Sequence, residues 1–377
     1  MDPRPQIVLF VGAGASQPFD LPTTAEFAYL IRQNLGQSSL LRRITDAPDV
    51  YDAEQILWIL ESLLSIKRSR GLQMVVENLL KEFLDNTAPR NRQSEITEPR
   101  ERASVRDVVV VGRGSEDALK SFLSEVEGLR EEIENLLFLA YSLKPERATK
   151  ARSVYEVITE QLFHCSQSHE LPIFTTNYDS AIETATERTG LYELIDGFVR
   201  TNGHRYFDST VWRKVPDRPT IKLFKLHGSL TYRLCVDGRI ESVATEDRHM
   251  TDARHKKNLL IHMGIDEYPY DEPFKSAHEF LEHYLMSADK CAVIGFTFRD
   301  RAINDIFDSS MTSNKALKLI LVDPSAKSIV DKRFQNLQHR VEMVEGRITD
   351  NFPNDFPMEK LASALGPPRE ESKNTSN

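Results

Sequence analysis

Cysteine is scarce in this chain of 377 residues, and the residue pairs that usually hold a metal ion are missing. Cys165, Cys235 and Cys291 lie far apart and form no CxxC pair, which excludes a zinc site of four thiolates. The 10 histidines include no HxxxH or HExxH pair. We therefore expect no metal site, and three buried thiols that behave as small hydrophobic side chains.

Long apolar runs and an excess of positive charge are also missing. No apolar run approaches the roughly 20 residues of a membrane span, and Ile7–Val11 is too short for the core of a secretory signal. The 57 acidic residues outnumber the 48 Lys and Arg residues, which gives a net charge of -9. Because this balance provides no general positive field, we expect no direct nucleic-acid binding, no membrane contact and a cytoplasmic location.

A helix-rich block interrupts an alternating pattern of strands and helices. A buried strand is predicted at Ile7–Val11, with a helix after it at Thr23–Asn34. Further strands are predicted at Leu171–Thr175, Ile221–Leu226, Asn258–His262, Lys290–Phe296 and Leu317–Val322. Helical stretches separate most of these strands, which indicates an α/β fold with a doubly wound, Rossmann-like parallel sheet.

The same pattern predicts the domain organisation. Residues 1–45 and 165–365 are assigned to the α/β domain, and residues 46–164 to an inserted helical region. A mobile loop is expected at about 88–116 and a disordered tail at 366–377, because both stretches are polar and nearly free of apolar residues. The loop contains arginines, but its acids balance them, so a solvated tether is favoured over a DNA-binding segment.

The first predicted strand runs directly into GAGAS, residues 12–16. Gly12 and Gly14 allow a tight turn in which backbone N–H groups approach a phosphate, and a following helix would direct its positive end toward the anion. A dehydrogenase would have a third glycine in place of Gln17 and an acid about 20 residues later, and this chain has neither. Alone, the motif also fits any strand-to-helix turn that needs glycine.

Two later strands end in polar residues that could act on a ligand. FTTNYD (Phe174–Asp179) offers the amide of Asn177 and the carboxylate of Asp179 at the edge where open α/β sheets bind ligands. The alternative is a turn stabilised by these side chains together with a helix cap. KLFKLHGSL (Lys222–Leu230) places His227 before a glycine, where its imidazole could act as a general base. The alternative is a core histidine with satisfied hydrogen bonds.

Two more strands end in a similar way. In AVIGFTFRDRAIN (Ala292–Asn304), Gly295 and Thr297 could present backbone and hydroxyl groups to a phosphate or a ribose. In LVDPS (Leu321–Ser325), Asp323 could accept a hydrogen bond from an adenosine ribose. A capped turn between strand and helix is the alternative at both positions.

Taken together, GAGAS, TTNYD, LHGS and IGFTFRD, in this chain order, resemble the sirtuin-like NAD-consuming domain. They are most similar to the zinc-free branch found in prokaryotic antiviral systems. The resemblance covers residues 7–36 and about 170–330. It implies NAD as the substrate, with Asn177 positioning the attacking water, His227 as the general base and Asp179 near the nicotinamide end or holding the loop in shape. The other residues that it places around NAD are Gly12, Ala13, Gly14, Ser16, Thr176, Gly295, Thr297 and Asp323.

Two departures from the deacetylating sirtuins indicate the reaction. Those enzymes carry four zinc cysteines between the His motif and the later Gly motif, where this chain has Cys235, with Cys291 at the far edge. Their motif usually reads TQN where this chain reads TTN. The resemblance therefore implies an NAD+ hydrolase that releases nicotinamide and ADP-ribose. An NAD or ADP-ribose sensor and a zinc-free deacylase are the alternatives.

The resemblance also implies a cellular role. The chain would be the NAD-depleting effector of an anti-phage, abortive-infection system. Its activity would be restrained until infection, because unrestrained NAD hydrolysis is toxic to its own cell. The inserted helices would contribute to a homo-oligomer. Chains of this size resemble those paired with a hexameric HerA-type ATPase, which is the expected partner.

Overall fold

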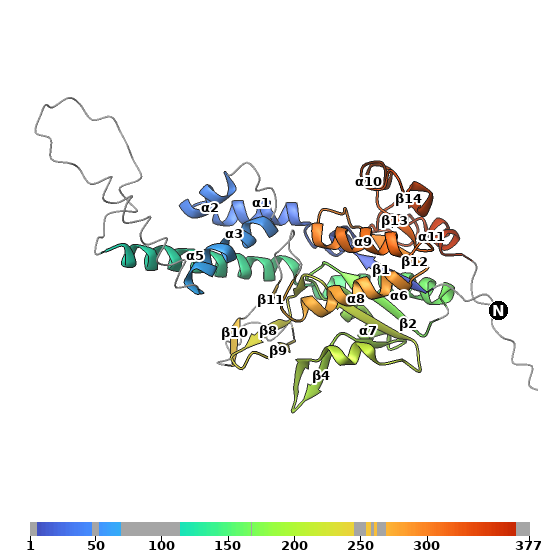
Figure 1. Cartoon of the computed structure of the whole chain (residues 1–377), viewed down its shortest axis with the longest axis horizontal. Coiled ribbons are helices and arrows are strands. Elements are labelled where there is room, and N and C mark those ends of the chain that lie inside the picture. The colour runs from blue at the N-terminus through green and yellow to red at the C-terminus, as the bar shows by residue number, and fades with distance from the viewer. Residues whose placement is uncertain are drawn as a thin grey trace, which may run out of the picture. The chain divides into compact units, whose positions relative to one another are not determined.

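The computed structural model describes residues 6–46, 53–68, 114–166, 168–244, 254–257, 260–261 and 269–366. The chain divides into two compact units, one of Met1–Phe27 with Leu137–Asn377 and one of Ala28–Leu136 (Figure 1). Most of the loop expected at about 88–116, and all but the first residue of the tail expected at 366–377, lie outside the described residues. No helix in the described part of the chain is both long and apolar enough to cross a membrane.

The first unit is built around a seven-stranded sheet in which every neighbouring pair is parallel. In spatial order its strands are β14 (Val341–Val344), β13 (Lys318–Val322), β12 (Lys290–Ile294), β1 (Ile7–Val11), β2 (Glu170–Thr175), β6 (Thr220–Lys225) and β3 (Glu193–Ile195). The chain leaves β1 toward β2 on one side and returns to build β12, β13 and β14 on the other. The predicted doubly wound, Rossmann-like sheet is thereby confirmed.

The direction of winding reverses at β1, because this strand pairs with β2 on one side and with β12 on the other. In open parallel sheets ligands bind outside the carboxyl ends of the strands at such a reversal. GAGAS follows β1, and IGFTFRD follows β12, so the reversal brings these two motifs to one place.

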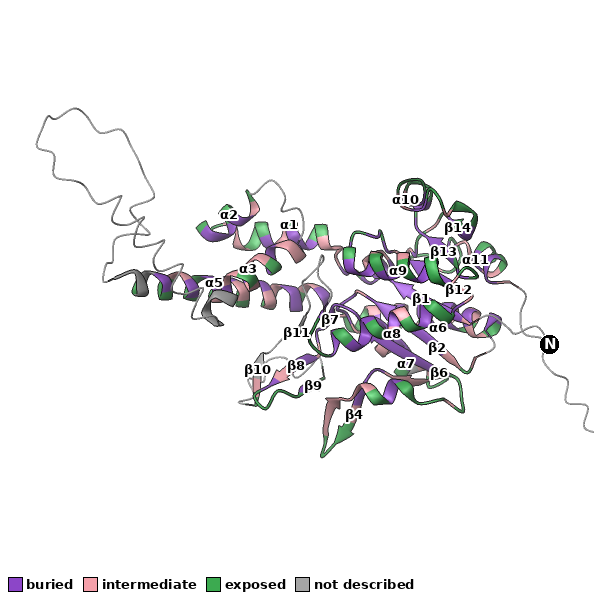
Figure 2. Ribbon diagram, viewed as in Figure 1, coloured by how far each residue is buried: buried purple, intermediate pink, exposed green. Residues whose placement is uncertain are grey.

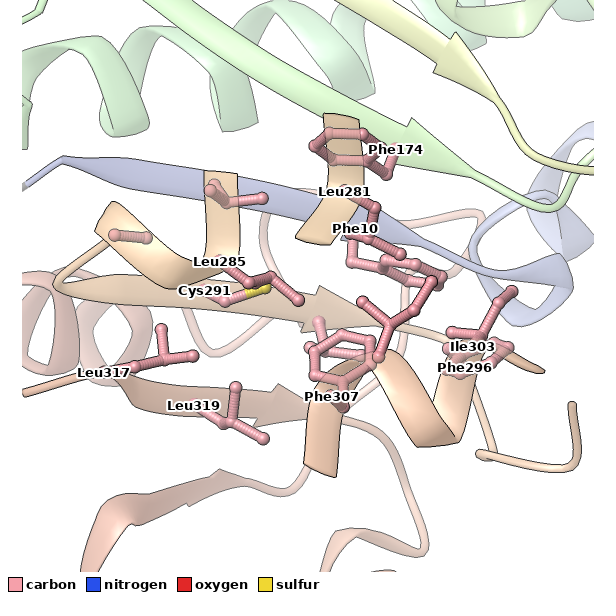
Figure 3. Close-up of a cluster of buried hydrophobic side chains, with 14 of the residues drawn as sticks. Phe10, Phe174, Leu281, Leu285, Cys291, Phe296, Ile303, Phe307, Leu317 and Leu319 are labelled. Atoms are coloured by element: carbon pink, nitrogen blue, oxygen red, sulfur yellow. The ribbon is translucent and has the colours of Figure 1, made fainter. Parts of the chain in front are cut away.

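The core on one face of the sheet is aromatic and aliphatic (Figure 3). Alternate residues of a strand point to opposite faces, so Val8 and Phe10 of β1 share this face with Cys291 and Val293 of β12. The helices α8 (Phe274–Ser287), α9 (Arg301–Ser313) and α10 (Ala326–Arg333) cover it with Leu281, Leu285, Ile303, Phe307 and Val330. Apolar burial of this kind contributes about 25 cal/mol per Å² removed from water.

The opposite face is covered as well, so the inner strands are buried on both sides (Figure 2). Helix α6 (Pro145–Cys165) contacts β2 and α7 (Ala181–Thr189), and α11 (Met358–Leu365) contacts α6, β13 and β14. All five residues of β1 are buried. Burial on both faces explains why these strands read as continuous apolar runs in the sequence.

Short antiparallel strands lie between β3 and α8, and among them only β11 falls within a strand predicted from the sequence. They are β4 (Phe198–Thr201), β5 (His204–Phe207), β7 (Gly228–Ser229), β8 (Tyr232–Cys235), β9 (Ile240–Ser242), β10 (His255–Lys257) and β11 (Leu260–Ile261). Five of them form a sheet in the order β10-β8-β9-β5-β4, and β11 pairs with β7. The strand predicted at Asn258–His262 therefore does not join the main sheet: its described part, β11, pairs antiparallel with β7.

The second unit is helical over its described residues. It contains most of α1 (Thr24–Leu35), all of α2 (Ser39–Thr45) and α3 (Ala53–Arg68), and α5 (Gly114–Tyr141) up to Leu136. Apolar side chains at helical spacing are buried in α3 and α5, among them Ile56, Leu60, Val126 and Ile133. An ion pair of 3.0 Å between Arg130 Nη2 and Glu61 Oε1 links these two helices.

Candidate active site

The GAGAS loop lies directly against Gly295, the first residue after β12. The N–H of Gly12 donates to Ile294 O at 2.9 Å, and that of Gly14 to Gly295 O at 3.0 Å. A Cβ added to Gly12 would lie 2.5 Å from Gly295 O, and one added to Gly295 would lie 2.4 Å from Ala15 N. Gly295 also has a φ of +65°, a left-handed conformation that favours glycine. These glycines are therefore required for the close approach of the two loops.

The backbone of GAGAS differs from the expected phosphate loop. A short 3-10 helix, η1 (Ala13–Ala15), is followed by a second, η2 (Gln17–Phe19), and α1 begins only at Thr24. The helix predicted at Thr23–Asn34 is therefore confirmed as α1, but the two 3-10 helices separate it from the loop, and its alignment with an anion stays a prediction. The N–H groups of Ala15 and Ser16 donate within the loop, to Gly12 O and Ala13 O. Ala13 N–H is the loop donor without a backbone acceptor in the described part of the chain.

Asn177, two residues past the end of β2, is fixed by three hydrogen bonds. Its Nδ2 donates to Ser16 Oγ at 2.9 Å and to Gly12 O at 3.1 Å, and its backbone N–H donates to Thr175 Oγ1 at 3.0 Å. Because both Nδ2 protons are used by the GAGAS loop, the amide orientation is determined. Its Oδ1 is buried and has no hydrogen-bond partner among the described residues. This oxygen can accept a hydrogen bond from a hydroxyl group or a water molecule.

Asp179 supports that arrangement. Its Oδ2 accepts from Ser16 Oγ at 2.9 Å, and its Oδ1 accepts from the N–H of Ala181 at 2.9 Å, at the start of α7. Ser16 thus links the amide of Asn177 to the carboxylate of Asp179. The side chain predicted to line the pyrophosphate loop is engaged in a network that joins the loops after β1 and β2.

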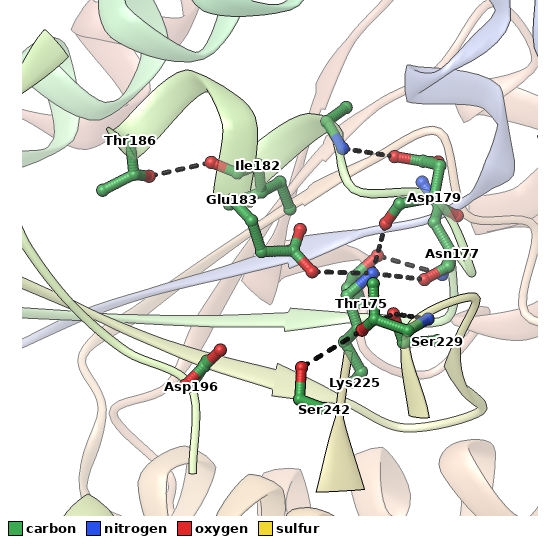
Figure 4. Close-up of polar contacts among 12 residues, drawn as sticks. Thr175, Asn177, Asp179, Ile182, Glu183, Thr186, Asp196, Lys225, Ser229 and Ser242 are labelled. Atoms are coloured by element: carbon green, nitrogen blue, oxygen red, sulfur yellow. Dashed lines mark hydrogen bonds and ion pairs between the residues drawn. The ribbon is translucent and has the colours of Figure 1, made fainter. Parts of the chain in front are cut away.

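Lys225, the last residue of β6, was missed by the sequence analysis. Its buried Nζ donates to Asn177 O at 3.3 Å and to Asp179 O, and it forms an ion pair of 3.2 Å with Glu183 Oε1 (Figure 4). Burial raises the pKa of Glu183, and the adjacent Lys225 charge offsets part of that rise. Lys225 therefore fixes the backbone that carries Asn177. Only its contacts, 48 and 46 residues away along the chain, reveal this role.

His227 is held by a second residue that the sequence analysis missed, Asp300. The distance between His227 Nε2 and Asp300 Oδ2 is 2.7 Å, and both side chains are buried. Asp300 Oδ1 accepts from the N–H of Ile303 at 2.9 Å, which caps α9. Burial alone would raise the pKa of Asp300, but the hydrogen bond and charge of His227 and the Ile303 N–H outweigh it and lower this pKa. Asp300 is therefore a carboxylate.

The segment after β12 reaches across the sheet edge to make this contact. Two strands, β1 and β2, separate β12 from β6, and neighbouring strands lie about 4.8 Å apart. The segment is anchored by Phe296 and Phe298, whose rings lie 5.0 Å apart in the core. Phe298 has a φ of +56°, which is uncommon for a bulky residue and costs about 1–3 kcal/mol. Packing of the Phe298 ring in the core offsets that cost and fixes the segment in which Asp300 contacts His227.

The strand register places Asn177 and His227 at the same edge. Thr175 of β2 pairs with Lys225 of β6, and the candidate residues Asn177 and His227 follow two positions later. The N–H of Leu230 donates to Tyr178 O at 3.1 Å, which ties the two loops together. The structure therefore brings together the predicted loop after β1, Asn177, Asp179 and His227.

The remaining predicted contacts surround the same edge. Thr176 is half-buried and its N–H donates to Val11 O at 3.3 Å, while Thr297 is exposed. Asp323 follows β13, two strands from β1, and its Oδ1 accepts from the N–H of Ser325 at 2.7 Å. Burial raises the pKa of Asp323. Of the residues predicted to contact NAD, Ala13, Gly14, Thr176, Gly295 and Thr297 are at least partly exposed.

Solved structures of Sir2 proteins are similar to this chain, but the similarity is low. A Sir2 homologue mutant in complex with 2'-O-acetyl ADP ribose has 14% sequence identity and a TM-score of 0.39, over 96% of this chain and 93% of that chain. A Sir2 homologue in complex with NAD has 11% identity and a TM-score of 0.35, over 95% of this chain and 88% of that chain. No curated protein matches the sequence. Residues 172–342, which carry Asn177, His227 and Asp300, match the family described as SIR2-like domain.

Proposed function

We propose that the chain is an NAD+ glycohydrolase that cleaves the nicotinamide–ribose bond and releases nicotinamide and ADP-ribose. One observation carries the proposal. A fixed amide with an unused acceptor, Asn177, and an imidazole held by a carboxylate, His227, follow neighbouring strands at the reversal of the sheet. The match of residues 172–342 to the SIR2-like domain supports NAD as the molecule that binds there.

Cleavage of the nicotinamide–ribose bond requires few catalytic groups. Nicotinamide leaves NAD+ as a neutral ring from a positively charged one, so its departure needs no proton from the enzyme. The ribose develops oxocarbenium character, as in other glycoside cleavages. The enzyme must hold the ribose, position one nucleophile and exclude bulk water. Asn177 and His227 match the first two tasks in type and are themselves buried.

Asn177 would orient the nucleophile through its Oδ1. Both protons of its Nδ2 are committed to Ser16 and Gly12, so the carbonyl oxygen cannot exchange places with the nitrogen without losing two hydrogen bonds. A water molecule or a ribose hydroxyl that donates to Oδ1 would satisfy this buried acceptor, whose burial without a partner costs about 1–3 kcal/mol.

His227 would take a proton through Nδ1. Because Asp300 is a carboxylate, it can only accept, so the proton of the neutral imidazole resides on Nε2. The lone pair of the ring is then on Nδ1, which is the basic atom. General-base assistance is typically worth 10²–10⁴-fold in rate. The carboxylate also stabilises the imidazolium that forms when the proton is accepted.

The experiment is nicotinamide release from NAD+ by the purified full-length chain, with His227→Ala and Asn177→Ala beside it. Exposed His164, at the end of α6, provides the matched control His164→Ala. We expect a loss of about three orders of magnitude for His227→Ala and wild-type rates for the control. Bound NAD without nicotinamide release, at any protein concentration, would instead identify a sensor. Release that requires an acyl-lysine peptide would identify a deacylase.

We further propose that this hydrolysis depletes NAD in an anti-phage, abortive-infection response, and that assembly with itself or with a HerA-type ATPase activates it. The resemblance of the four motifs to the zinc-free antiviral branch supports this role. Nicotinamide release should then rise more steeply than linearly with protein concentration, or on addition of the ATPase. A specific activity that is constant under both treatments would contradict gating by assembly.

A further inference from the structure

A second cluster of reactive side chains lies in the five-stranded antiparallel sheet. Cys235 ends β8, Glu241 is the middle residue of β9, and His255 begins β10. Their ligand atoms all lie within 4.8 Å of one another. We propose that Cys235, Glu241 and His255 form a zinc-binding site that joins β8, β9 and β10, and that His204 holds the carboxylate in place from β5.

The strand register places these side chains on one face of the sheet. Residues directly opposite each other in antiparallel strands share a face, as do residues two apart in one strand. His255 pairs with Cys235, and Glu241 pairs with Arg233, two positions before Cys235. Glu241 also pairs with Tyr206, two positions after His204. All four side chains therefore point the same way from four adjacent strands.

The distances within the cluster suit one small cation. Glu241 Oε2 lies 2.8 Å from His255 Nε2 and 3.8 Å from Cys235 Sγ. Zinc bonds of about 2.0–2.3 Å in a tetrahedron hold ligand atoms about 3.3–3.8 Å apart. A shift of about 0.5–1 Å in His255 would therefore open room for the ion. The other carboxylate oxygen, Oε1, lies 2.7 Å from His204 Nδ1, an outer contact of the kind that orients metal ligands.

The donor types select the metal. A thiolate, an imidazole and a carboxylate form a mixed sulfur, nitrogen and oxygen set, which suits zinc and disfavours magnesium or calcium. The side chains of Cys235, Glu241 and His255 are buried, whereas His204 is partly exposed. Three protein ligands with a solvent-facing edge leave the fourth position to water.

A bound metal ion would stabilise the five-stranded sheet. Its strands are three or four residues long, and its own buried hydrophobic cluster consists of Phe198, Tyr232 and Ile240. Short strands with so small a core gain much from a metal that links them. The proposal departs from the expectation of no metal site, because these ligands are 6 and 14 residues apart and match no CxxC or HxxxH spacing.

The first experiment measures zinc in the full-length chain purified without chelators. We expect about one zinc per chain in the wild type and a loss of at least tenfold in Cys235→Ser and His255→Gln. Cys165→Ser, which removes another buried cysteine, is the matched control and should retain the metal. His204→Ala should weaken binding by about 10–100-fold, as an outer partner does.

The second experiment tests metal binding in the wild type, so its result does not depend on whether a variant folds. Cobalt(II) added to metal-free wild-type protein should give tetrahedral visible bands and a near-ultraviolet thiolate-to-cobalt band, and Cys165→Ser should keep both. Wild-type protein without the thiolate band, or with zinc content equal to that of folded Cys235→Ser, would overturn the proposal. The cluster would then be a hydrogen-bonded group around Glu241, with Arg254 beside His204 as the neutralising charge.

Discussion

Asp300 determines which nitrogen of His227 is basic. A carboxylate at 2.7 Å from Nε2 retains the proton there and leaves Nδ1 to act. The interaction depends on two elements, the cap of α9 and the loop after β6, so the ring orientation is built into the fold. Asp300 is therefore a positioning residue for the proposed reaction.

Asp300→Asn should reduce kcat for nicotinamide release by about 10²-fold or more and change KM little. The amide of Asn can donate to Nε2, which would stabilise the tautomer with its proton on Nδ1 and remove the base. Exposed Asp305, on the same helix, supplies the control Asp305→Asn, which should match the wild type. Steady-state kinetics of all three proteins test this, and unchanged kcat in a folded Asp300→Asn protein would contradict the assigned role.

The lowered pKa of Asp300 also predicts a pH dependence of stability. A carboxyl group whose folded pKa lies below its unfolded value of about 3.9 contributes stability above that value. The contribution is lost as pH falls through the folded pKa. The difference in free energy of unfolding between the wild type and Asp300→Asn should therefore be largest near neutral pH and shrink below about pH 4. Urea titrations at several pH values measure it, and a pH-independent difference would refute the linkage.

At the scale of elements, Lys225 ties the end of β6 to the loop after β2 and to α7. Lys225→Met should destabilise the protein by about 3–5 kcal/mol, because Glu183 would be left buried without its counter-charge. The double variant Lys225→Met with Glu183→Leu should recover most of this loss in urea unfolding. Its nicotinamide release should stay low, since the backbone at Asn177 and Asp179 loses its donor. A double variant as unstable as the single one would show that the charge is not the cause.

Elements of the main sheet could be predicted because burial leaves a clear pattern. Ile7–Val11 and residues 319–322 are apolar and buried throughout, which indicates a covered parallel strand. β14 (Val341–Val344) was missed because its central residues, Glu342 and Met343, are exposed at the sheet edge. β7, with two residues, is too short to show any periodicity.

Part of the candidate site could also be predicted from the sequence. Asn177 and His227 could be selected as candidate residues because strand ends followed by polar residues are local features of the sequence. Lys225 and Asp300 could not, since a lysine inside an apolar run and an aspartate before a helix have many ordinary explanations. Asp300 acts on a residue 73 positions away, and only the fold brings the two together.

At the scale of the whole molecule, the sheet depends on a strand far from the rest of its sequence. β1 occupies the centre of the sheet, yet along the chain residues 28–136, which form a separate unit, lie between it and β2. Ligand contacts proposed for Ala13 and Gly295 both involve the reversal at β1. Binding of NAD should therefore stabilise the sheet-containing unit as a whole, and the effect should appear in its thermal unfolding.

His227→Ala provides the cleanest form of that test, because it should bind NAD+ without consuming it. NAD+ at a hundredfold excess over Kd adds about 2.7 kcal/mol to stability. At about 2–4 °C per kcal/mol for a domain of this size, Tm should rise by roughly 5–10 °C. In the wild type the shift should decay during incubation as NAD+ is hydrolysed, whereas in His227→Ala it should persist. Scanning calorimetry before and after incubation measures both. A stable shift in both proteins would favour a sensor, and no shift in either would remove NAD+ as the ligand of this site.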